Sequence, residues 1–575
     1  MKEQQKEPIT VIIGNPPYSV GQKNANDDNQ NLHYPQLEQT LRDTYVANSK
    51  SSLSKGTYDS YIKAFRWATD RLGDKGIIGF VTNGGYLDSN SADGLRASFY
   101  KEFNYLYIFN LRGNARTQGE QRRKEKDNVF GQGTRTPIAI SILVKDGSDA
   151  HKLYYHDIGD YLSRKEKLQI LVNSNNIDGL DWEQITPDEN KDWINQRDPN
   201  YQNYSSIVGE QTSPFYNNAI GVSTNRDAWV YGYNRSLVLK HVKTLEDNYN
   251  AEVDNNEREV SLLDSKKIKW TQKLKNYLTK GIKLEFNPGK MQLSMYRPYT
   301  KKWLYFNDDV VERPGQYYKK WGKENLTLVT TGRGASRGFS VLVTDVIPNM
   351  DSLEKGQGFM LYDNRENDES NLFEMSHDNV NQLFADKLGL SLDDTFAYVY
   401  GLLSSPEYQQ KYANDLKKDL ARIPVVAEKE KYVEVGKKLI DLHINYEEVP
   451  VYEGVTIDAP ENPSYKVEKM KFAKKRNPET QKLENDWSII IFNSDITIKN
   501  IPEKAYEYVV NGRSAIEWII AQYQVKTDEK SGITDDPNDF SSDHKYVFNL
   551  LLRIINVSVQ TVDLVNSLPK LEIIE

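Results

Sequence analysis

Residues 9–18 read ITVIIGNPPY, and this stretch determines the fold expected for the N-terminal part of the chain. The β-branched run 9–13 is typical of a buried strand, which is covered on both faces of its sheet. Pro16 and Pro17 cannot donate to a strand ladder, so the strand must end before them. The sequence therefore predicts a strand that leads directly into a loop containing Asn15, Pro16, Pro17 and Tyr18.

Asn15, Pro16, Pro17 and Tyr18 are the candidate catalytic residues, because together they suit methylation of an aromatic amine. The exocyclic amine of adenine is a poor nucleophile, since its lone pair is delocalised into the ring. The Asn15 side-chain carbonyl and the Pro16 backbone carbonyl would accept its two hydrogens, and Pro17 would rigidify the loop. Tyr18 would stack on an extruded base. The alternative is a turn that only ends a strand.

Strand-like and helical segments alternate downstream of this motif. Helical spacing at 58–72 precedes an apolar strand at 76–83, a helix at 89–101 and strands at 104–111 and 136–145. Such alternation predicts an α/β unit. The last two strands have no room for a long helix between them, so an antiparallel pair is expected. The polar stretches 22–55 and 112–135 are expected to be loops.

The character of the sequence changes beyond residue 205, where the patterns become mixed. We expect two regions, 1–205 and 206–575, the second forming one or two compact domains. Its recognisable pieces are two aromatic strand-like runs, 227–233 (DAWVYGY) and 301–306 (KKWLYF), a basic helical stretch, 266–278, two helices around Ser405-Pro406, and an amphipathic helix, 513–523.

The bulk composition excludes several classes of site and protein. The chain has 575 residues, no Cys and seven scattered His, so disulfides, thiolate zinc sites and cysteine nucleophiles are excluded, and no metal site is expected. No run approaches the roughly 18 apolar residues that span a bilayer, and the N-terminus lacks a signal-peptide pattern. A cytoplasmic protein without membrane contact is therefore expected.

Charge is distributed unevenly along the chain. Residues 1–150 hold 20 Lys and Arg against 17 Asp and Glu, whereas the whole chain has a net charge of −8. Any nucleic-acid surface must therefore be a local basic stripe on an acidic body. The loop 112–135 is the main candidate, as a mobile clamp on phosphates or simply a solvated loop. Its cationic residues are Arg112, Arg116, Arg122, Arg123, Lys124, Lys126 and Arg135.

Other basic positions lie in the C-terminal region. Arg226, in the run Thr224-Asn225-Arg226, is either a DNA contact or a buried polar brace. The same two interpretations apply to Tyr296-Arg297-Pro298-Tyr299, for which the brace is favoured. The remaining candidates are more typical of a solvated face. They are Lys266, Lys267, Lys269, Lys273, Lys275, Arg333 and Arg337.

In combination these segments resemble the gamma-type amino-methyltransferases of bacterial restriction-modification systems. VIIGNPPY (11–18) resembles their motif IV, and the following segments resemble, in order, motif V (58–72), motif VI (76–83), motif VII (105–114) and motif VIII (136–145). The C-terminal half resembles the target-recognition region of single-polypeptide Type ISP enzymes, close to Type IIG, at 221–234, 295–306, 398–424 and 517–539. The resemblance implies an α/β fold: a partial Rossmann-like class I methyltransferase sheet, followed by a mixed α+β target-recognition region.

The resemblance also implies S-adenosylmethionine as the methyl donor and double-stranded DNA, methylated at adenine N6, as the partner. Such enzymes bind the donor mainly through a glycine-containing motif I upstream of NPPY, and only eight residues precede the first strand here. GRGASRG (332–338) lacks a βαβ context and is interpreted as a basic loop. The residues that bind the donor are therefore not identified in this sequence.

The chain is consequently expected to be the C-terminal part of a larger enzyme, inactive alone. Its missing N-terminal part would carry the nuclease, helicase and remaining methyltransferase elements. Two alternatives stay open. One is a DNA-binding specificity module without catalysis. The other is an RNA or protein-amide methyltransferase, because NPPY also occurs in enzymes that methylate RNA bases or protein glutamine amides.

Overall fold

Two compact units, Met1–Pro199 and Asn200–Glu575, make up the chain, and each is described by itself. The computed structural model describes residues 9–17, 33–50, 55–117, 119–131, 133–255, 267–315, 325–363, 377–478, 481 and 483–575. The division falls six residues before the boundary expected at 205/206.

Unit 1 is built on a six-stranded sheet with the order β1-β2-β4-β3-β5-β6. The strands are β1 (Ile9–Gly14), β2 (Leu72–Asn83), β3 (Tyr105–Arg112), β4 (Ile138–Lys145), β5 (Lys152–Asp157) and β6 (Glu183–Ile185). β1 pairs in parallel with β2, and β3 with β5, whereas β4 runs antiparallel to both β2 and β3. The expected antiparallel pair is therefore confirmed. The carboxyl ends of β1, β2, β3 and β5 meet at one edge of the sheet.

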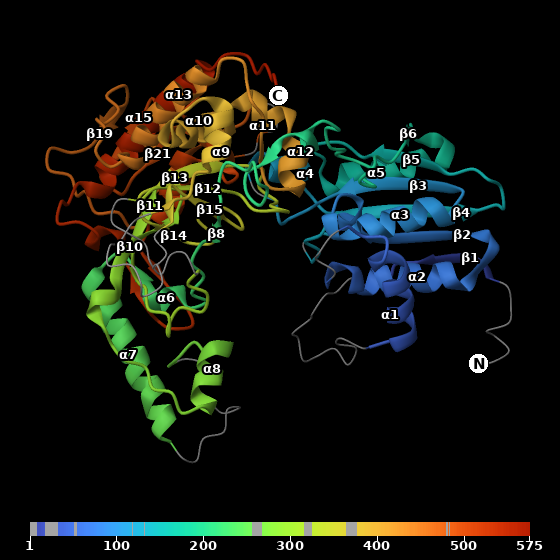
Figure 1. Ribbon diagram of the computed structural model, residues 1–575, viewed down its shortest axis with the longest axis horizontal. Coiled ribbons are helices and arrows are strands. Elements are labelled where there is room, and N and C mark those ends of the chain that lie inside the picture. The colour runs from blue at the N-terminus through green and yellow to red at the C-terminus, as the bar shows by residue number, and fades with distance from the viewer. Residues whose placement is uncertain are drawn as a thin grey trace. The chain divides into compact units, whose positions relative to one another are not determined.

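Helices α2 (Ser60–Arg71) and α3 (Asp93–Glu102) cover one face of this sheet (Figure 1). Their aromatic side chains meet above it, with the ring centroids of Phe65 and Phe99 5.0 Å apart. Ile78 of β2 and Ile108 of β3 point into the same core. On the other face, α5 (Arg164–Ser174) packs Ile170 against a smaller cluster at the β3–β5 side. The helices expected at 58–72 and 89–101 are confirmed.

β1 lies at the edge of the sheet and is less buried than its sequence predicts. Ile12 packs into the core under the helices, but Val11 and Ile13 on the opposite face are 54% and 81% exposed. Ile77 on β2 is 40% exposed on the same face. The expectation of a strand covered on both faces is wrong here, because α5 covers only the distant part of that face and β1 has one paired neighbour among the described residues.

Two segments expected to be loops contain helices. Within 22–55, residues Pro35–Leu41 form α1, which continues as a π-helical turn to Val46 and buries Leu41 and Tyr45. Within 112–135, residues Gly119–Glu125 form α4. Both helices are short and mostly polar, so local periodicity gives them little signal.

In the described residues of unit 2, three four-stranded sheets are accompanied by four two-stranded pairs. The first sheet holds β14 (Ile347–Pro348), β10 (Met291–Arg297), β11 (Thr300–Tyr305) and β9 (Tyr231–Gly232). The second sheet holds β13 (Val341–Thr344), β12 (Thr327–Thr330), β15 (Gln357–Met360) and β8 (Ala219–Ile220). The third sheet holds β19 (Thr456–Asp458), β22 (Thr497–Lys499), β21 (Leu483–Ile491) and β20 (Lys471–Arg476). The pairs are β7 (Ser205–Ser206) with β18 (Arg422–Ile423), β16 (Tyr362–Asp363) with β17 (His377–Asp378), β23 (Val509–Val510) with β24 (Arg513–Ser514), and β25 (Lys526–Thr527) with β26 (Thr534–Asp535).

Helices fill the spaces around these sheets. They are α6 (Asp227–Val230), α7 (Arg235–Asp254), α8 (Gln272–Thr279), α9 (Gln382–Leu388), α10 (Leu392–Ser404), α11 (Pro406–Lys411), α12 (Ala413–Lys418), α13 (Lys429–Ile444), α14 (Ala515–Gln522) and α15 (Tyr546–Asn566). α10 and α13 pack backbone to backbone, because a Cβ on Gly401 would lie 2.2 Å from the Tyr432 carbonyl oxygen. The helices expected on either side of Ser405-Pro406 and at 513–523 are confirmed.

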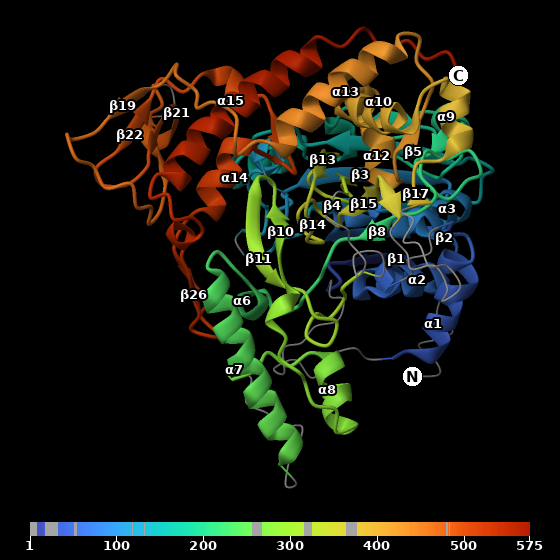
Figure 2. The same ribbon diagram turned by 60° about the vertical axis from the view of Figure 1, so that its left-hand side comes forward.

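The run DAWVYGY (227–233) forms the short helix α6 before β9, so the strand expected over the whole run is wrong. The Thr224 hydroxyl accepts from the Arg226 backbone N–H at 3.1 Å and starts a turn there. Such local side-chain bonds compete with strand pairing. Farther along, α7 and α8 lie side by side and share a core that includes Leu245 and Leu274 (Figures 1 and 2).

α15 is the longest helix in the described part of the chain, and it runs along α13 in unit 2 (Figure 2). It is long and apolar enough to cross a bilayer by length and composition alone. However, 61% of its apolar window is buried inside the protein. This burial is that of a core helix.

Candidate active site

The candidate catalytic loop leaves the carboxyl end of β1. Among the described residues, Asn15 and Pro17 are exposed and Pro16 is half-buried, so no described segment covers Asn15. Gly14 is paired with Phe80, and a Cβ on Gly14 would lie 3.3 Å from the Phe80 ring. This close packing fixes the point from which Asn15 projects. Tyr18 lies outside the described residues, so its stacking role stays a prediction.

The ends of β2 and β4 are tied together at the same edge of the sheet. Asn83 closes β2 by accepting from the Gly85 backbone N–H at 2.9 Å. The backbone N–H of Gly84, the residue between Asn83 and Gly85, donates to the Pro137 carbonyl oxygen at 2.8 Å. The carboxyl end of β2, the neighbour of β1, is thus bonded to the chain that enters β4.

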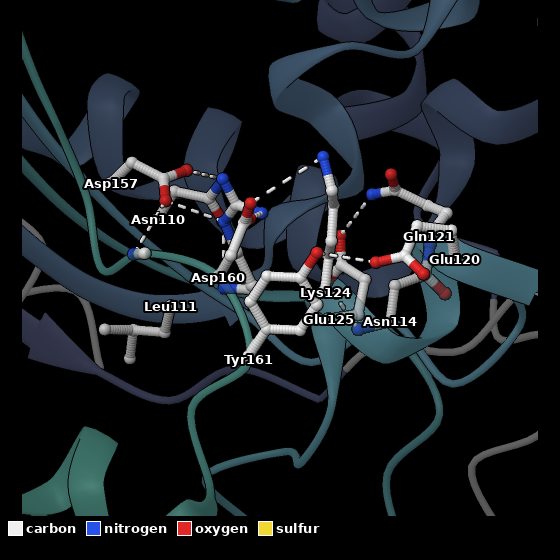
Figure 3. Close-up of polar contacts among 12 residues, drawn as sticks. Asn110, Leu111, Asn114, Glu120, Gln121, Lys124, Glu125, Asp157, Asp160 and Tyr161 are labelled. Atoms are coloured by element: carbon white, nitrogen blue, oxygen red, sulfur yellow. Dashed lines mark hydrogen bonds and ion pairs between the residues drawn. The ribbon is translucent and has the colours of Figure 1, made fainter.

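Three of the seven cations of the loop 112–135 form ion pairs within unit 1, and two more donate to backbone carbonyls. Arg112 donates to Asp157 at 2.6 Å and also pairs with Asp160 (Figure 3). Lys124 lies 3.7 Å from the second Asp160 oxygen. The Arg112 backbone is left-handed, with φ 53°, which turns the chain sharply at the end of β3. These contacts fold the basic loop against the β5–α5 connection.

The other cations of this loop differ in their exposure and in whether another group already binds them. Arg123 pairs with Glu120 at 2.7 Å, Arg122 donates to the Lys126 carbonyl, and Lys126 donates to the Tyr161 carbonyl at 2.5 Å. Arg116 and Arg135 are exposed, and neither has an ion pair in the part of the chain that the structure describes. Of the seven predicted phosphate contacts, these two are the most accessible.

Two buried polar side chains hold the loop in shape. The Lys167 Nζ donates to the carbonyl oxygens of Leu111, Glu125 and Asp127 at 3.0, 3.1 and 2.8 Å. Burial lowers the pKa of Lys167 to about 8. Asn128 donates to the carbonyl oxygens of Gly113 and Thr136 at 3.1 and 2.8 Å. The basic loop is therefore fastened from inside, and its contact with phosphates stays a prediction.

Asn128 also presents an aromatic residue at this edge of the sheet. Its side-chain oxygen accepts from the Phe130 backbone N–H at 2.9 Å, and the Phe130 side chain is 44% exposed. Neither Lys167 nor Phe130 is a candidate from the sequence. A single aromatic residue within a polar loop is the signal that points to Phe130, whereas nothing local distinguishes Lys167.

Arg226 lies in the interior of unit 2, where it is 1% exposed. Its guanidinium donates to the Thr271 hydroxyl at 2.5 Å, and burial lowers its pKa to about 10. The adjacent Asp227 accepts from the Tyr296 hydroxyl at 3.0 Å. This placement favours the buried brace over a direct DNA contact. No group of three or more His, Asp and Glu in the described residues is arranged to hold a metal ion.

The fold and site define a class of protein: part of an α/β methyltransferase sheet with the candidate loop Asn15-Pro16-Pro17 at its carboxyl edge, joined to a mixed α+β region. The chain belongs to the Type ISP restriction-modification family. Residues 213–550 match the Type ISP C-terminal specificity domain, and residues 2–116 match the Eco57I restriction-modification methylase. No curated protein matches the chain. The fold class and the resemblance inferred from the sequence are confirmed.

Three solved structures are similar over the whole chain. A nuclease-deletion mutant of the Type ISP enzyme LlaGI, in complex with a DNA substrate mimic, is 49% identical with a TM-score of 0.88. The ATP-dependent Type ISP enzyme LlaBIII bound to DNA is 39% identical (0.87), and the DrdV–DNA complex is 30% identical (0.84). The chain covers 54%, 38% and 58% of those chains, respectively, and so spans about half their length.

Proposed function

We propose that this chain supplies the base-binding loop and the target-recognition region for methylation of adenine N6 in duplex DNA, as part of a restriction-modification enzyme. The observation that carries the proposal is the position of Asn15-Pro16-Pro17, which leaves a parallel strand at the carboxyl edge of the sheet. Ligands of open α/β sheets bind outside the carboxyl ends of their strands. Action on cellular DNA would place this activity in the cytoplasm.

The chemistry of the loop follows from its two acceptors. The Asn15 side-chain carbonyl accepts one hydrogen of the adenine amine, and the Pro16 backbone carbonyl accepts the other. Both hydrogens leave the ring plane, so the nitrogen lone pair becomes available for attack. No base has to remove a proton beforehand, and the extra proton leaves after transfer. Phe130 and Tyr18 are the aromatic residues proposed to stack on the extruded base.

S-adenosylmethionine supplies the methyl group when bound. The described residues do not form its pocket, because no glycine-rich strand-to-helix turn adjoins Asn15. The open edge of β1 is where a further strand would bring such a turn next to the loop, and the exposed Val11 and Ile13 fit a strand that is covered by more protein. We therefore propose that the remaining part of the enzyme pairs with this edge and holds the donor.

Methyl transfer is the experiment that tests the proposal. The chain is completed with an upstream methyltransferase part from a similar Type ISP enzyme and incubated with labelled S-adenosylmethionine and duplex DNA, RNA or protein. Label on adenine in duplex DNA alone is the expected result. Label on RNA or protein would contradict the proposal. DNA binding without methylation, even in the completed enzyme, would favour the non-catalytic specificity module.

A further inference from the structure

Unit 2 gathers five cations from segments that are far apart in the sequence. Four of them lie on or beside strands and one lies in the turn between β12 and β13. We refer to them as the cation cluster. Its members are Arg297, Lys302, Arg337, Arg513 and Lys526.

Arg337 and Arg513 are brought together by a tight hairpin. Asn511 and Gly512 form its turn with φ of 50° and 79°, conformations that favour Asn and Gly. A Cβ on Gly512 would lie 3.2 Å from the Arg337 Cβ, so the two chains touch there. The Arg513 guanidinium, next in the chain, lies 5.2 Å from the centre of the Trp518 ring on α14.

Lys526 extends the cluster along α14. Its Nζ donates to the Ala521 carbonyl oxygen at 2.7 Å, one helical turn beyond Trp518. In the β25–β26 hairpin, Lys526 is the cross-strand partner of Asp535. Lys302 approaches the same carboxylate from β11, with Nζ 2.7 Å from the Asp535 Oδ2. Two cations therefore flank one acid.

Arg297 joins the cluster through an aromatic ring. Its Cζ lies 4.1 Å from the centre of the Tyr296 ring, and the Lys302 Nζ lies 4.6 Å from the same ring. The Arg297 guanidinium also donates to the Asn349 side chain at 3.2 Å. These bonds hold the positive charge in place without neutralising it.

Few acids balance these charges. Asp535 pairs with Lys302, and Glu354 lies 4.0 Å from the Arg337 Nε while accepting the backbone N–H groups of Ser336 and Arg337. Burial and then the nearby Arg513 and Arg297 lower the pKa of Arg337, despite Glu354. Lys526 behaves similarly, with burial and then Lys302 and the two arginines lowering its pKa. The cations thus repel one another, and a polyanion would relieve that repulsion.

We infer that the cation cluster binds the phosphodiester backbone of duplex DNA. Lys526 is exposed as a residue, although its ammonium is partly buried, and Arg337 and Arg513 are partly exposed, so the cluster can be reached from solvent. Cations that are held close together suit the charges of a phosphate backbone, whose contacts set register and orientation. The inference rests on the proposed function, because it assigns part of the DNA surface of the target-recognition region.

The salt dependence of DNA binding by the full chain tests this inference. The probe is a mixed-sequence duplex of about 30 base pairs, and the variants are R337Q, R513Q, K526Q and their combination. Removal of each cation should make the slope of log K against log salt shallower by about 0.9, and weaken binding about fivefold near 0.15 M salt. K438A, which removes an exposed cation paired with Glu434 on α13, is the matched control and should change neither quantity.

Three outcomes separate the possibilities. Failure of the unaltered chain to bind duplex DNA would count against DNA recognition as a whole. Binding that R337Q, R513Q and K526Q leave unchanged, with folding verified by circular dichroism, would overturn only the cluster assignment. Polyglutamate that displaces the duplex at equal charge concentration would also overturn it, because the cluster would then fit an acidic protein equally well.

Discussion

The Lys167 ammonium lies 3.0 Å from the carbonyl oxygen of Leu111 and so joins α5 to the carboxyl end of β3. Its other two bonds reach the carbonyls of Glu125 and Asp127, at the far end of the same loop. One buried side chain thus closes a stretch of chain that carries most of the cations of the loop 112–135. The shape of this loop depends on a residue well outside it.

Replacing Lys167 with Met should loosen that loop. The substitution keeps the length of the side chain but leaves three buried carbonyls without this donor, so unit 1 should lose on the order of 3 kcal/mol of unfolding free energy. Hydrogen exchange should accelerate at the amides of 111–117 and 119–127. K165M changes an exposed lysine on the same helix and should have neither effect. Unchanged exchange in K167M would show that the loop is held by its ion pairs alone.

Replacing Asn15 with Ala should remove catalysis and spare DNA binding. In the completed enzyme the methylation rate should fall by about 100-fold or more, the size of effect seen when one polar group that stabilises a transition state is removed. Methylation is measured with labelled S-adenosylmethionine and binding by fluorescence anisotropy. T10A, an exposed change on β1, serves as the control. Equal loss of methylation and binding in N15A would contradict the role assigned to Asn15.

Glu246 on α7 should make the stability of unit 2 depend on pH. The side chain is 1% exposed, and burial raises its pKa from 4.5 to about 7. Between pH 4.5 and about 7, the Glu246 carboxyl therefore keeps its proton in the folded state and loses it in the unfolded state. The unfolding free energy should fall as pH rises from 4.5 through 7, by on the order of 3 kcal/mol.

E246Q should remove this fall, because Gln is neutral throughout. The measurement is urea unfolding at pH 5 and pH 8, followed by tryptophan fluorescence. D247N changes the next residue, which is 58% exposed, and should keep the dependence of the unaltered protein. An E246Q protein that still loses the same stability between the two pH values would assign the effect to another group.

The open edge of β1 gives a paired test. I13K places a charge on a side chain that is 81% exposed and should change the unfolding free energy by no more than about 0.5 kcal/mol. It should also reduce concentration-dependent association in sedimentation, because charges on edge strands oppose pairing. I12K, one residue away, points into the core and should destabilise unit 1 strongly. Equal destabilisation by both changes would show that the edge face is covered.

Much of unit 1 is predictable from local sequence. The strands β1 to β4 follow from short apolar runs, and α2 follows from helical spacing. The catalytic loop is predictable because its residues are consecutive. In contrast, Asp157 and Asp160 lie 45 and 48 residues after Arg112, which they neutralise. Ion pairs over such separations leave no periodic trace, so the loop appears more available for DNA in the sequence than in the fold.

The same reasoning applies to the C-terminal region, whose helices around Ser405-Pro406 and at 513–523 are predicted but whose cation cluster is not. The cation cluster joins residues from 297 to 526, and no single segment of it is unusually basic. In the sequence Arg226 suits either a DNA contact or a buried brace, and the fold buries it beside Thr271. Helix α15 is absent from the predicted elements, although its polar residues from Asn549 to Asp563 recur at helical spacing on one face. Burial of this kind is decided by packing between distant segments.

The carboxylate of Asp535 has a consequence for exchanging recognition specificity between related enzymes. One oxygen accepts from the Tyr233 backbone N–H at 2.8 Å, and the other pairs with Lys302 at 2.7 Å. A hybrid with a single crossover between residues 310 and 520 would inherit the two sides of this junction from different parents. Recombinants should therefore fold if the segment with Tyr233 and Lys302 and the segment with Asp535 come from the same parent, or if both parents have Asp535 and Lys302. A new DNA specificity should then require the transfer of both segments, which are far apart in the sequence.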